Sequence, residues 1–368
     1  MRAVIVAARR TAVMPHGGAF AAHLPHDLAA PVIRALLADA GLETGQVDEV
    51  IRANALGAGG NPARLAALVA GLPDRVAGLG LDRQCAGGLD AVALAAALVG
   101  SGQAQAVIAG GAESWSRRPL RLTRAPGRAP EAYDAPPFTP WPDRDPDMAE
   151  AADRLAVSRG ITRAAQEAFA VASHAKARDA QPMPEIVALS GITSDGFTRH
   201  LTDRMAARAP VVHGSITAAT MAVAADGAAF VLVVSEAVAG RLRPALAPVP
   251  IRAALTLGSQ PDQPALSAIA PLKAALRQAG LASSDLWATE IMEAFAVQAM
   301  VTVADCGLDP ARVNRGGGAL ARGHPIGASG AVLAVRLVHE LQRGGDGCGT
   351  GAAAIAAAGG IGSALVLG

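Results

Sequence analysis

The chain has 368 residues, of which 51% are hydrophobic and 17% charged, with a net charge of +1. This length allows two or three domains, and the apolar content excludes global disorder. The balanced charge, without a basic block, argues against nucleic acid as the main partner. Three scattered cysteines exclude a disulfide framework or a zinc cluster, and the eight histidines show no metal-binding spacing. We therefore expect no bound metal.

The first apolar run, residues 3–8, is too short for a signal peptide and ends at Arg9-Arg10, so it predicts a β-strand. No stretch offers the roughly 18 uninterrupted apolar residues that a membrane span needs. Residues 352–367 come nearest, but three glycines interrupt them. We expect a soluble cytoplasmic protein with no membrane partner.

Apolar runs typical of β-strands alternate with Ala- and Leu-rich helical stretches, a pattern that predicts a layered α/β fold. Strands are expected at residues 3–8, 50–54, 106–109, 228–234, 251–257 and 286–291, and again within 352–367. Helices are expected at residues 27–40, 63–71, 89–99, 271–279 and 331–341. The helix at 89–99 is almost wholly apolar, so it must be buried between two layers.

A central segment interrupts this alternation. Arg, Pro and Asp crowd residues 117–147, and a more charged helical stretch follows at 148–179. Such a composition predicts a loop domain that lies over the surface. The expected units are an N-terminal half (1–117 and 211–245), a loop domain (118–210) and a C-terminal half (246–368).

Two glycine-rich turns carry the residues with catalytic potential. Cys85 lies in DRQCAGG directly before the apolar helix, and His324 lies in GGALARGHPIGASG. Glycines at such turns let the backbone approach a ligand closely. A cysteine and a histidine presented in this way suggest a nucleophile and its base. The start of the helix after Cys85 is expected to lower the pKa of the thiol.

Simpler interpretations exist for both residues. A lone cysteine is usually an inert core residue, and a turn histidine can simply bond to nearby backbone. An unrelated cysteine hydrolase is disfavoured, because the chain has no G-x-S-x-G elbow or papain-like cysteine segment. A weak echo between residues 85–88 and 327–330, each followed by a helix, favours two similar halves that face each other.

The chain resembles the thiolase family over nearly its whole length. The resemblance rests on short segments whose order and spacing are together highly specific. They are ARRTAVMPHGGAF (8–20), NPARLAALVAGLP (61–73), residues 82–116 and 148–177, DGAA (226–229), MEAFA (292–296) and GGALARGHPIGASGA (317–331). The resemblance implies a five-layered αβαβα fold of two similar halves with an inserted loop domain. It also implies acyl-CoA as substrate, no permanently bound cofactor, and a homodimer or homotetramer.

The resemblance assigns roles to individual residues. Cys85 matches the nucleophile that becomes acylated, and His324 matches the base that takes its proton. Met148 matches a methionine of the loop that faces the pantetheine arm of CoA, and Ala222 stands where a serine contacts that arm. The residues expected at the acyl pocket are Ala294 and Phe295 on its wall and Gly360 on its rim.

Several departures from the family fall on the chemistry. The second catalytic cysteine corresponds to Ala356, and Cys348 comes eight residues earlier in a GDGCGTG turn. Cys348 replaces it only if its loop folds back into the site; otherwise it is a turn cysteine on the solvent side. Met292 replaces an asparagine that positions an oxyanion-hole water, and a thioether cannot donate a hydrogen bond. Cys306 is expected in the core.

We therefore expect a thiolase-like acyl-CoA acyltransferase that forms an acyl-Cys85 intermediate with His324 as general base. Ordinary thiolysis and Claisen condensation should be weak, since the second base is missing. The sequence does not distinguish whether the acyl group passes to a carbon, an oxygen or a thiol. The alternative is a non-catalytic or weakly catalytic acyl-CoA-binding subunit that scaffolds a multi-enzyme complex.

Overall fold

The computed structural model describes residues 2–57, 59–343 and 349–368. The N-terminal strands are β1 (Ala3–Arg10), β2 (Met14–Pro15), β3 (Glu49–Ala53), β4 (Ala77–Leu81), β5 (Ala106–Ser114) and β10 (Ala225–Ser235). The C-terminal strands are β11 (Val249–Gly258), β12 (Leu286–Ile291), β13 (Thr350–Ala357) and β14 (Ile361–Leu367). They form one sheet in the order β12-β13-β14-β11-β1-β10-β5-β3-β4, and β2 pairs with β10.

The principal helices before β5 are α1 (Pro25–Ala40), α2 (Pro62–Ala70) and α3 (Gly87–Ser101). Those after β11 are α8 (Ile269–Ala279), α9 (Ala296–Asp305), the short α10 (Ala319–Arg322) and α11 (Ile326–Arg343). Between β5 and β11 lie β6 (Arg121–Thr123), β7 (Glu131–Tyr133), α4 (Met148–Arg159), α5 (Arg163–Asp179), α6 (Asp203–Ala207), β8 (Val211–His213), β9 (Ile216–Thr217) and α7 (Glu236–Ala239).

The two halves of the sheet repeat one topology. In the first half β1 pairs antiparallel with β10, β10 antiparallel with β5, and β5 parallel with β3. In the second half β11, β14, β13 and β12 follow the same sequence of antiparallel, antiparallel and parallel pairing. The halves join where β1 meets β11, through Val4 opposite Pro250 and Ile5 opposite Val249. The predicted pair of similar halves is confirmed.

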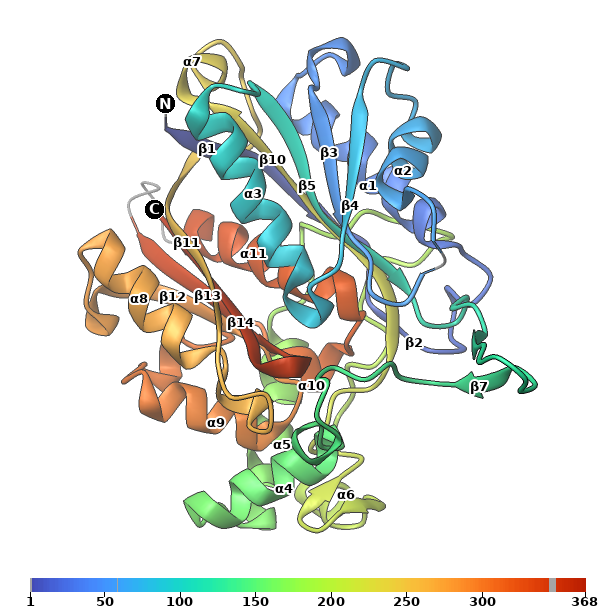
Figure 1. Cartoon of the computed structure of the whole chain (residues 1–368). Coiled ribbons are helices and arrows are strands. Elements are labelled where there is room, and N and C mark those ends of the chain that lie inside the picture. The colour runs from blue at the N-terminus through green and yellow to red at the C-terminus, as the bar shows by residue number, and fades with distance from the viewer. Residues whose placement is uncertain (1, 58, 344–348) are drawn as a thin grey trace.

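The three largest hydrophobic clusters lie between the layers, one on each outer face of the sheet and one in the centre. Helices α1 and α2 cover the outer face of the first half, and α8 and α9 cover the outer face of the second (Figure 1). Helices α3 and α11 fill the space between the two half-sheets. Because side chains alternate along a strand, Val4 and Val6 of β1 join the outer core while Ile5 joins the central one. The layers therefore run αβαβα.

Helices α3 and α11 touch through their backbones. A Cβ atom on Gly88 would lie 2.6 Å from the backbone nitrogen of Ala331, and one on Gly330 would lie 2.5 Å from that of Leu89. Only glycine fits at these reciprocal positions. The segment Gln84–Ser101 is apolar enough by composition to cross a membrane, and half of it is buried. Helix α3 packs in the central layer through one side, whereas Ala97 on its other side is exposed, so the expected burial between two layers is only partly met.

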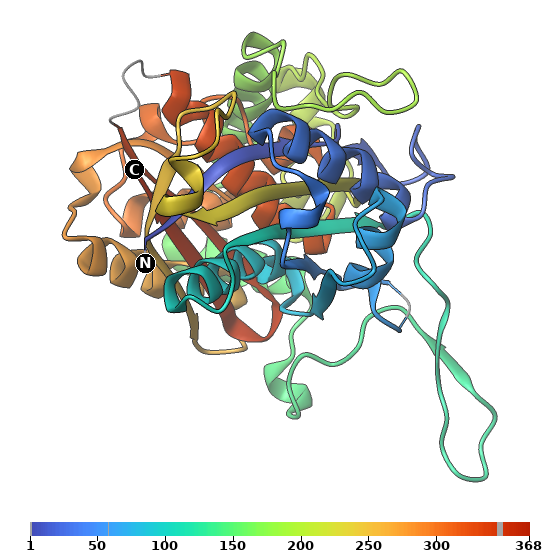
Figure 2. The same cartoon turned by 90° about the horizontal axis from the view of Figure 1, so that it is seen from above.

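The sequence located most of the long elements but missed helix α9 and the edge strand β4. This strand, AGLGL, alternates its apolar residues with two glycines and is largely exposed. Glycine is depleted in strands, so the segment gives only a weak strand signal. The β6–β7 hairpin was also not predicted, and it extends away from the body of the molecule (Figure 2). The boundaries of the loop domain at 118 and 210 remain a prediction.

Replacing Gly330 with valine should destabilise the protein, since the new side chain would overlap the backbone of Leu89. Overpacking of this kind costs about 1–3 kcal/mol. Urea unfolding followed by circular dichroism measures the change. The control is Gly45→Val, where a Cβ meets no atom within 4 Å and the expected change is within about 0.5 kcal/mol. Equal stability of the two variants would contradict the close packing.

Candidate active site

Cys85 lies in a single helical turn, Gln84–Ala86, immediately before α3. Gln84 has a φ of 52°, a left-handed backbone conformation that is uncommon for a residue other than glycine. Its N–H donates to Oδ1 of Asp82 at 2.8 Å, which stabilises the turn. The chain therefore reverses sharply just before Cys85, and the half-buried thiol lines a cavity.

His324 comes from the other half of the molecule. Its backbone N–H donates to the carbonyl of Val223 at 2.8 Å. Its ring lies between Cys85 and Ser329, with Nε2 3.2 Å from Sγ and Nδ1 2.6 Å from Oγ. The Ser329 hydroxyl donates to the carbonyl of Pro325 at 3.1 Å, so its oxygen accepts the Nδ1 proton. Nε2 is then the acceptor that faces the thiol.

Both partners of the pair are neutral at neutral pH. Burial raises the pKa of the Cys85 thiol to about 12, and the carboxylates of Glu113 and Asp82 act in the same direction. Burial lowers the pKa of His324 to about 4. A backbone hydrogen bond at Cys85, at the start of α3, acts to lower the thiol pKa, as expected, but burial outweighs it, so the net shift is opposite to the expectation. The proton can pass to His324 as the sulfur attacks an electrophile.

The cavity beside the pair has a volume of about 360 Å³ and lies where the two halves meet the segment between β5 and β10. Its walls are almost wholly apolar. Among the described residues that line it, Cys85 and His324 are the only ones with side chains that exchange protons. The others are Gln84, Trp115, Phe138, Met148, Ala151, Met221, Ala222, Ala224, Pro264, Ala265, Ala294, Phe295, Gln298, Ile326 and residues 356–358.

Four of the residues expected at the pocket line this cavity: Met148, Ala222, Ala294 and Phe295. The N–H of Ala222 donates to the carbonyl of Ala294 at 2.9 Å, which joins two of the walls. Gly360 is not among the lining residues; its carbonyl accepts the N–H of Ser259 at 2.8 Å.

Several contributors to the site were missed from the sequence. Ser329 lies within the quoted motif, five residues after His324, so its spacing was the available signal. Trp115, Phe138 and Gln298 reach the cavity from three separate segments, and nothing in the sequence connects them.

The residues that depart from the family pattern lie in different places: one lines the cavity and others are in the core. Ala356 lines the cavity, so a methyl group stands at that wall. Met292 is buried in the central core and does not line the cavity. Cys306 packs in the core beneath α8, as expected. Cys348 lies outside the described residues.

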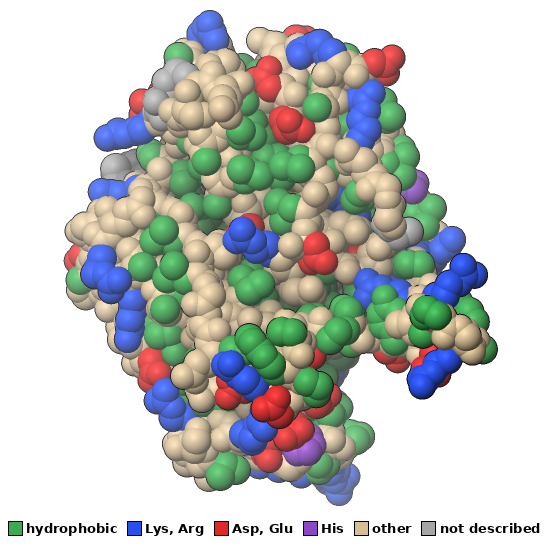
Figure 3. All heavy atoms as spheres, viewed as in Figure 1, with side chains coloured by type: hydrophobic (Ala, Val, Ile, Leu, Met, Phe, Trp, Pro, Cys, Tyr) green, Lys and Arg blue, Asp and Glu red, His purple; other side chains and the backbone are tan. Residues whose placement is uncertain are grey.

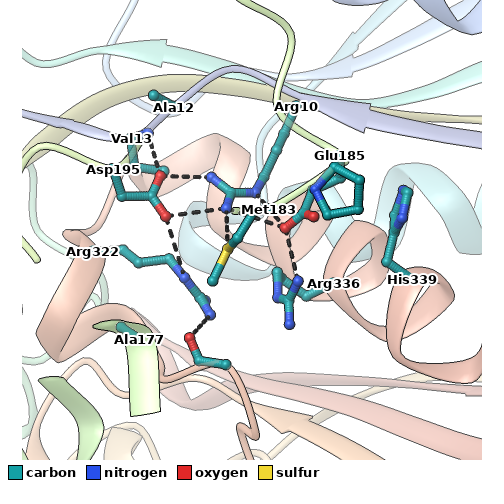
Figure 4. Close-up of polar contacts among 12 residues, drawn as sticks. Arg10, Ala12, Val13, Ala177, Met183, Glu185, Asp195, Arg322, Arg336 and His339 are labelled. Atoms are coloured by element: carbon teal, nitrogen blue, oxygen red, sulfur yellow. Dashed lines mark hydrogen bonds and ion pairs between the residues drawn. The ribbon is translucent and has the colours of Figure 1, made fainter. Parts of the chain in front are cut away.

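A buried ionic network holds the loop that leads to His324 (Figure 4). Arg10, at the end of β1, donates to Asp195 at 2.6 Å and to Glu185 at 3.2 Å. Arg336 of α11 donates to the same oxygen of Glu185 at 2.8 Å.

Arg322 connects this network to the loop before His324. It lies 3.5 Å from Asp195, and it donates to the carbonyls of residues 316 and 317. Because Arg322 is two residues before His324, the network anchors the turn that carries His324.

Glu293, in the MEAFA segment, also holds this loop through hydrogen bonds. It accepts hydrogen bonds from the Ser173 hydroxyl and the Asn314 amide, both at 2.7 Å. It also accepts the backbone N–H of Leu320 at 3.3 Å. In the sequence this glutamate stands out only as part of a motif, whereas the structure gives it a positioning role.

The neutral pair has a measurable consequence for alkylation of Cys85. Only the thiolate reacts with iodoacetamide, and a thiol with a pKa near 12 gains about tenfold in thiolate for each pH unit below that value. The alkylation rate of Cys85, followed by peptide mass spectrometry, should therefore rise steadily from pH 6 to pH 10. A rate that is already high and constant across pH 6–8 would instead indicate a preformed thiolate–imidazolium pair.

Comparison with known proteins places this geometry in a family. Residues 3–237 match the model of the thiolase N-terminal domain, and residues 246–368 match that of the thiolase C-terminal domain. YhfS of Bacillus subtilis is 40% identical over 378 residues, covering 100% of this chain and 99% of that protein. An acetyl-CoA acetyltransferase of Rhizobium meliloti is 37% identical, covering 98% of this chain and 97% of the relative.

The fold agrees with a solved structure. The crystal structure of the Bacillus anthracis acetyl-CoA acetyltransferase superimposes with a TM-score of 0.89 at 32% identity, covering 100% of this chain and 98% of that one. Two family models that together span almost the whole chain, and this structural match, agree with the layered halves and the paired turns. The chain belongs to the thiolase family and is an enzyme of the acyltransferase class.

Proposed function

We propose that this enzyme takes an acyl group from acyl-CoA onto Cys85, with His324 as the general base. The observation that carries the proposal is the 3.2 Å contact between Sγ and Nε2 at the wall of an apolar cavity. His324 takes the thiol proton as sulfur attacks the thioester carbonyl, and it returns that proton to the departing CoA thiolate. The relatives named as acetyl-CoA acetyltransferases support CoA thioesters as the substrate class.

The cavity walls suggest how the substrate lies. Met148 and Ala222 border the approach that we assign to the pantetheine arm, and Ala294 and Phe295 border the acyl group. Gly360 lies outside this wall, whereas Ala358 lines the cavity. No permanently bound cofactor is part of the proposal.

Ordinary thiolysis and Claisen condensation should be slow, because Ala356 offers no group that moves a proton on carbon. The same replacement, together with Met292, favours the second candidate function, an acyl-CoA-binding subunit of a larger complex. Acylation of Cys85 separates the two candidates.

We further propose a homodimer or homotetramer in the cytoplasm, a reducing compartment that keeps Cys85 as a free thiol. Exposed apolar side chains on α2 and the edge strand β4 support self-association: Leu65, Leu68, Val69 and Leu79. The projecting β6–β7 hairpin carries hydrophobic and basic side chains together, among them Leu120 and Leu122 (Figure 3). This hairpin is the surface that a different protein could use in a hetero-complex.

Intact-protein mass spectrometry after incubation with acetyl-CoA and longer acyl-CoAs should show an acyl-sized mass increase. Cys85→Ala should abolish it, whereas Cys306→Ala should retain it, because Cys306 is buried in the core. His324→Ala should slow acylation by about 100- to 10,000-fold, the usual contribution of a general base. Folded protein that gains no mass with any donor would favour the binding-subunit function.

Ser329→Ala should slow acylation of Cys85 without changing the affinity for acyl-CoA, because it removes the acceptor that orients the His324 ring. Loss of a partner for a buried donor costs about 1–3 kcal/mol, or roughly 5- to 150-fold in rate. Single-turnover acylation measures the rate, and calorimetric titration of Cys85→Ala and Cys85→Ala/Ser329→Ala with acyl-CoA measures binding. Ser158→Ala, which removes an ordinary serine–backbone bond in α4, is the control. An unchanged acylation rate would remove Ser329 from its positioning role.

A further inference from the structure

We infer that the acyl acceptor is a second thiol, so that the enzyme moves acyl groups from CoA to another thiol rather than to carbon. This inference rests on the proposed acylation of Cys85. It follows from the proton-transfer groups that the cavity contains and from the chemistry that those groups allow.

The described residues that line the cavity supply one base for the second half of the reaction. Among its described lining residues, the polar side chains besides Cys85 and His324 are Gln84, Gln298 and Trp115. Amide and indole groups are not bases at ordinary pH. Gln298 is also already engaged, since its Oε1 accepts the N–H of Ala294 at 3.3 Å. Once Cys85 is acylated, Nε2 of His324 is the group that can take a proton from the acceptor.

A thiol acceptor requires nothing more than this single imidazole. The acceptor S–H gives its proton to Nε2, and its sulfur attacks the acyl carbon. The bond from that carbon to Sγ of Cys85 then breaks, and the departing thiolate takes the proton back from His324. This half-reaction is the reverse of Cys85 acylation with a different thiol, so the groups that release CoA also admit the acceptor. The net change is acyl-S-CoA + RSH → acyl-S-R + CoA-SH.

Acceptors other than a thiol require a stronger base or an additional base in the site. An ordinary thiol has a pKa of about 8.5, and water one of about 15.7, whereas the α-carbon of a thioester is a far weaker acid than a thiol. Burial lowers the pKa of His324 to about 4, which makes its imidazole a weak base. The most acidic of these acceptors is therefore favoured. The wall at Ala356 supplies a methyl group and no second base.

A carbon acceptor that loses CO2 would need no base, but it would bring a carboxylate into the cavity. No Lys or Arg is among the described residues that line it. Burying an unpaired carboxylate in apolar surroundings is costly. The walls therefore disfavour such an acceptor.

The test follows the fate of the acyl group. Wild-type enzyme is incubated with acetyl-CoA, or with the donor that best acylates Cys85, and with pantetheine as the thiol probe; Cys85→Ala gives the uncatalysed background. Chromatography with mass spectrometry should show acyl-pantetheine forming at least about 100-fold faster than the carbon-condensation product, the factor that a missing base accounts for. Condensation at an equal rate, condensation that requires malonyl-CoA, or hydrolysis without transfer to the thiol would each overturn the inference.

A second variant tests the reason for the preference. Ala356→Cys places a thiol at the cavity wall and should raise carbon condensation by at least about tenfold while thiol exchange continues. Ala282→Cys, at an exposed position, controls for a thiol elsewhere and should match wild type. No gain in Ala356→Cys, with exchange intact, would overturn the role of the missing base. Absence of any adduct on Cys85 would instead refute the proposed acylation, so the two failures are distinguishable.

Discussion

The close approach of α3 and α11 is the contact on which the rest of the site depends. The two helices cross with backbone against backbone at Gly88 and Gly330. Cys85 comes three residues before the first glycine and His324 six residues before the second. One packing contact therefore brings together a thiol and an imidazole that are 239 residues apart in the chain. Because interiors transmit strain rather than absorb it, a change at the crossing moves both residues.

The distribution of charge complements this packing. Arginines and carboxylates are absent from the described wall of the cavity and gather behind the turn that carries His324. There Arg10, Arg322 and Arg336 meet Glu185 and Asp195. Buried charges are tolerated when they are paired and hydrogen-bonded, and here they fasten the loop that leads to His324. The cavity itself remains apolar, and its thiol and imidazole are both neutral at rest. Such a site suits acyl transfer, in which the proton moves only as the new bond forms.

Much of the fold and the centre of the site could be predicted from the sequence. Long apolar periodic segments identified most central strands and helices, and the glycine-rich turns identified Cys85 and His324. Edge strand β4 was missed because its two glycines weaken the strand pattern. Gln298 was missed because its distance from Cys85 along the chain says nothing about distance in space. The pKa of the thiol was predicted in the wrong direction. A helix start is visible in a sequence, whereas the depth of burial that opposes it is not.

The layered class of fold, the family and the replacement of a cysteine by Ala356 can all be established from the amino-acid sequence. These are local properties, carried by periodicity, turn residues and the identity of side chains within motifs. The tertiary structure alone decided that Ala356 lines the cavity while Met292 and Gly360 do not, and that Ser329 orients His324. It also decided that the pair is neutral. Contacts between segments hundreds of residues apart, and the burial that shifts a pKa, arise only when the layers close on one another.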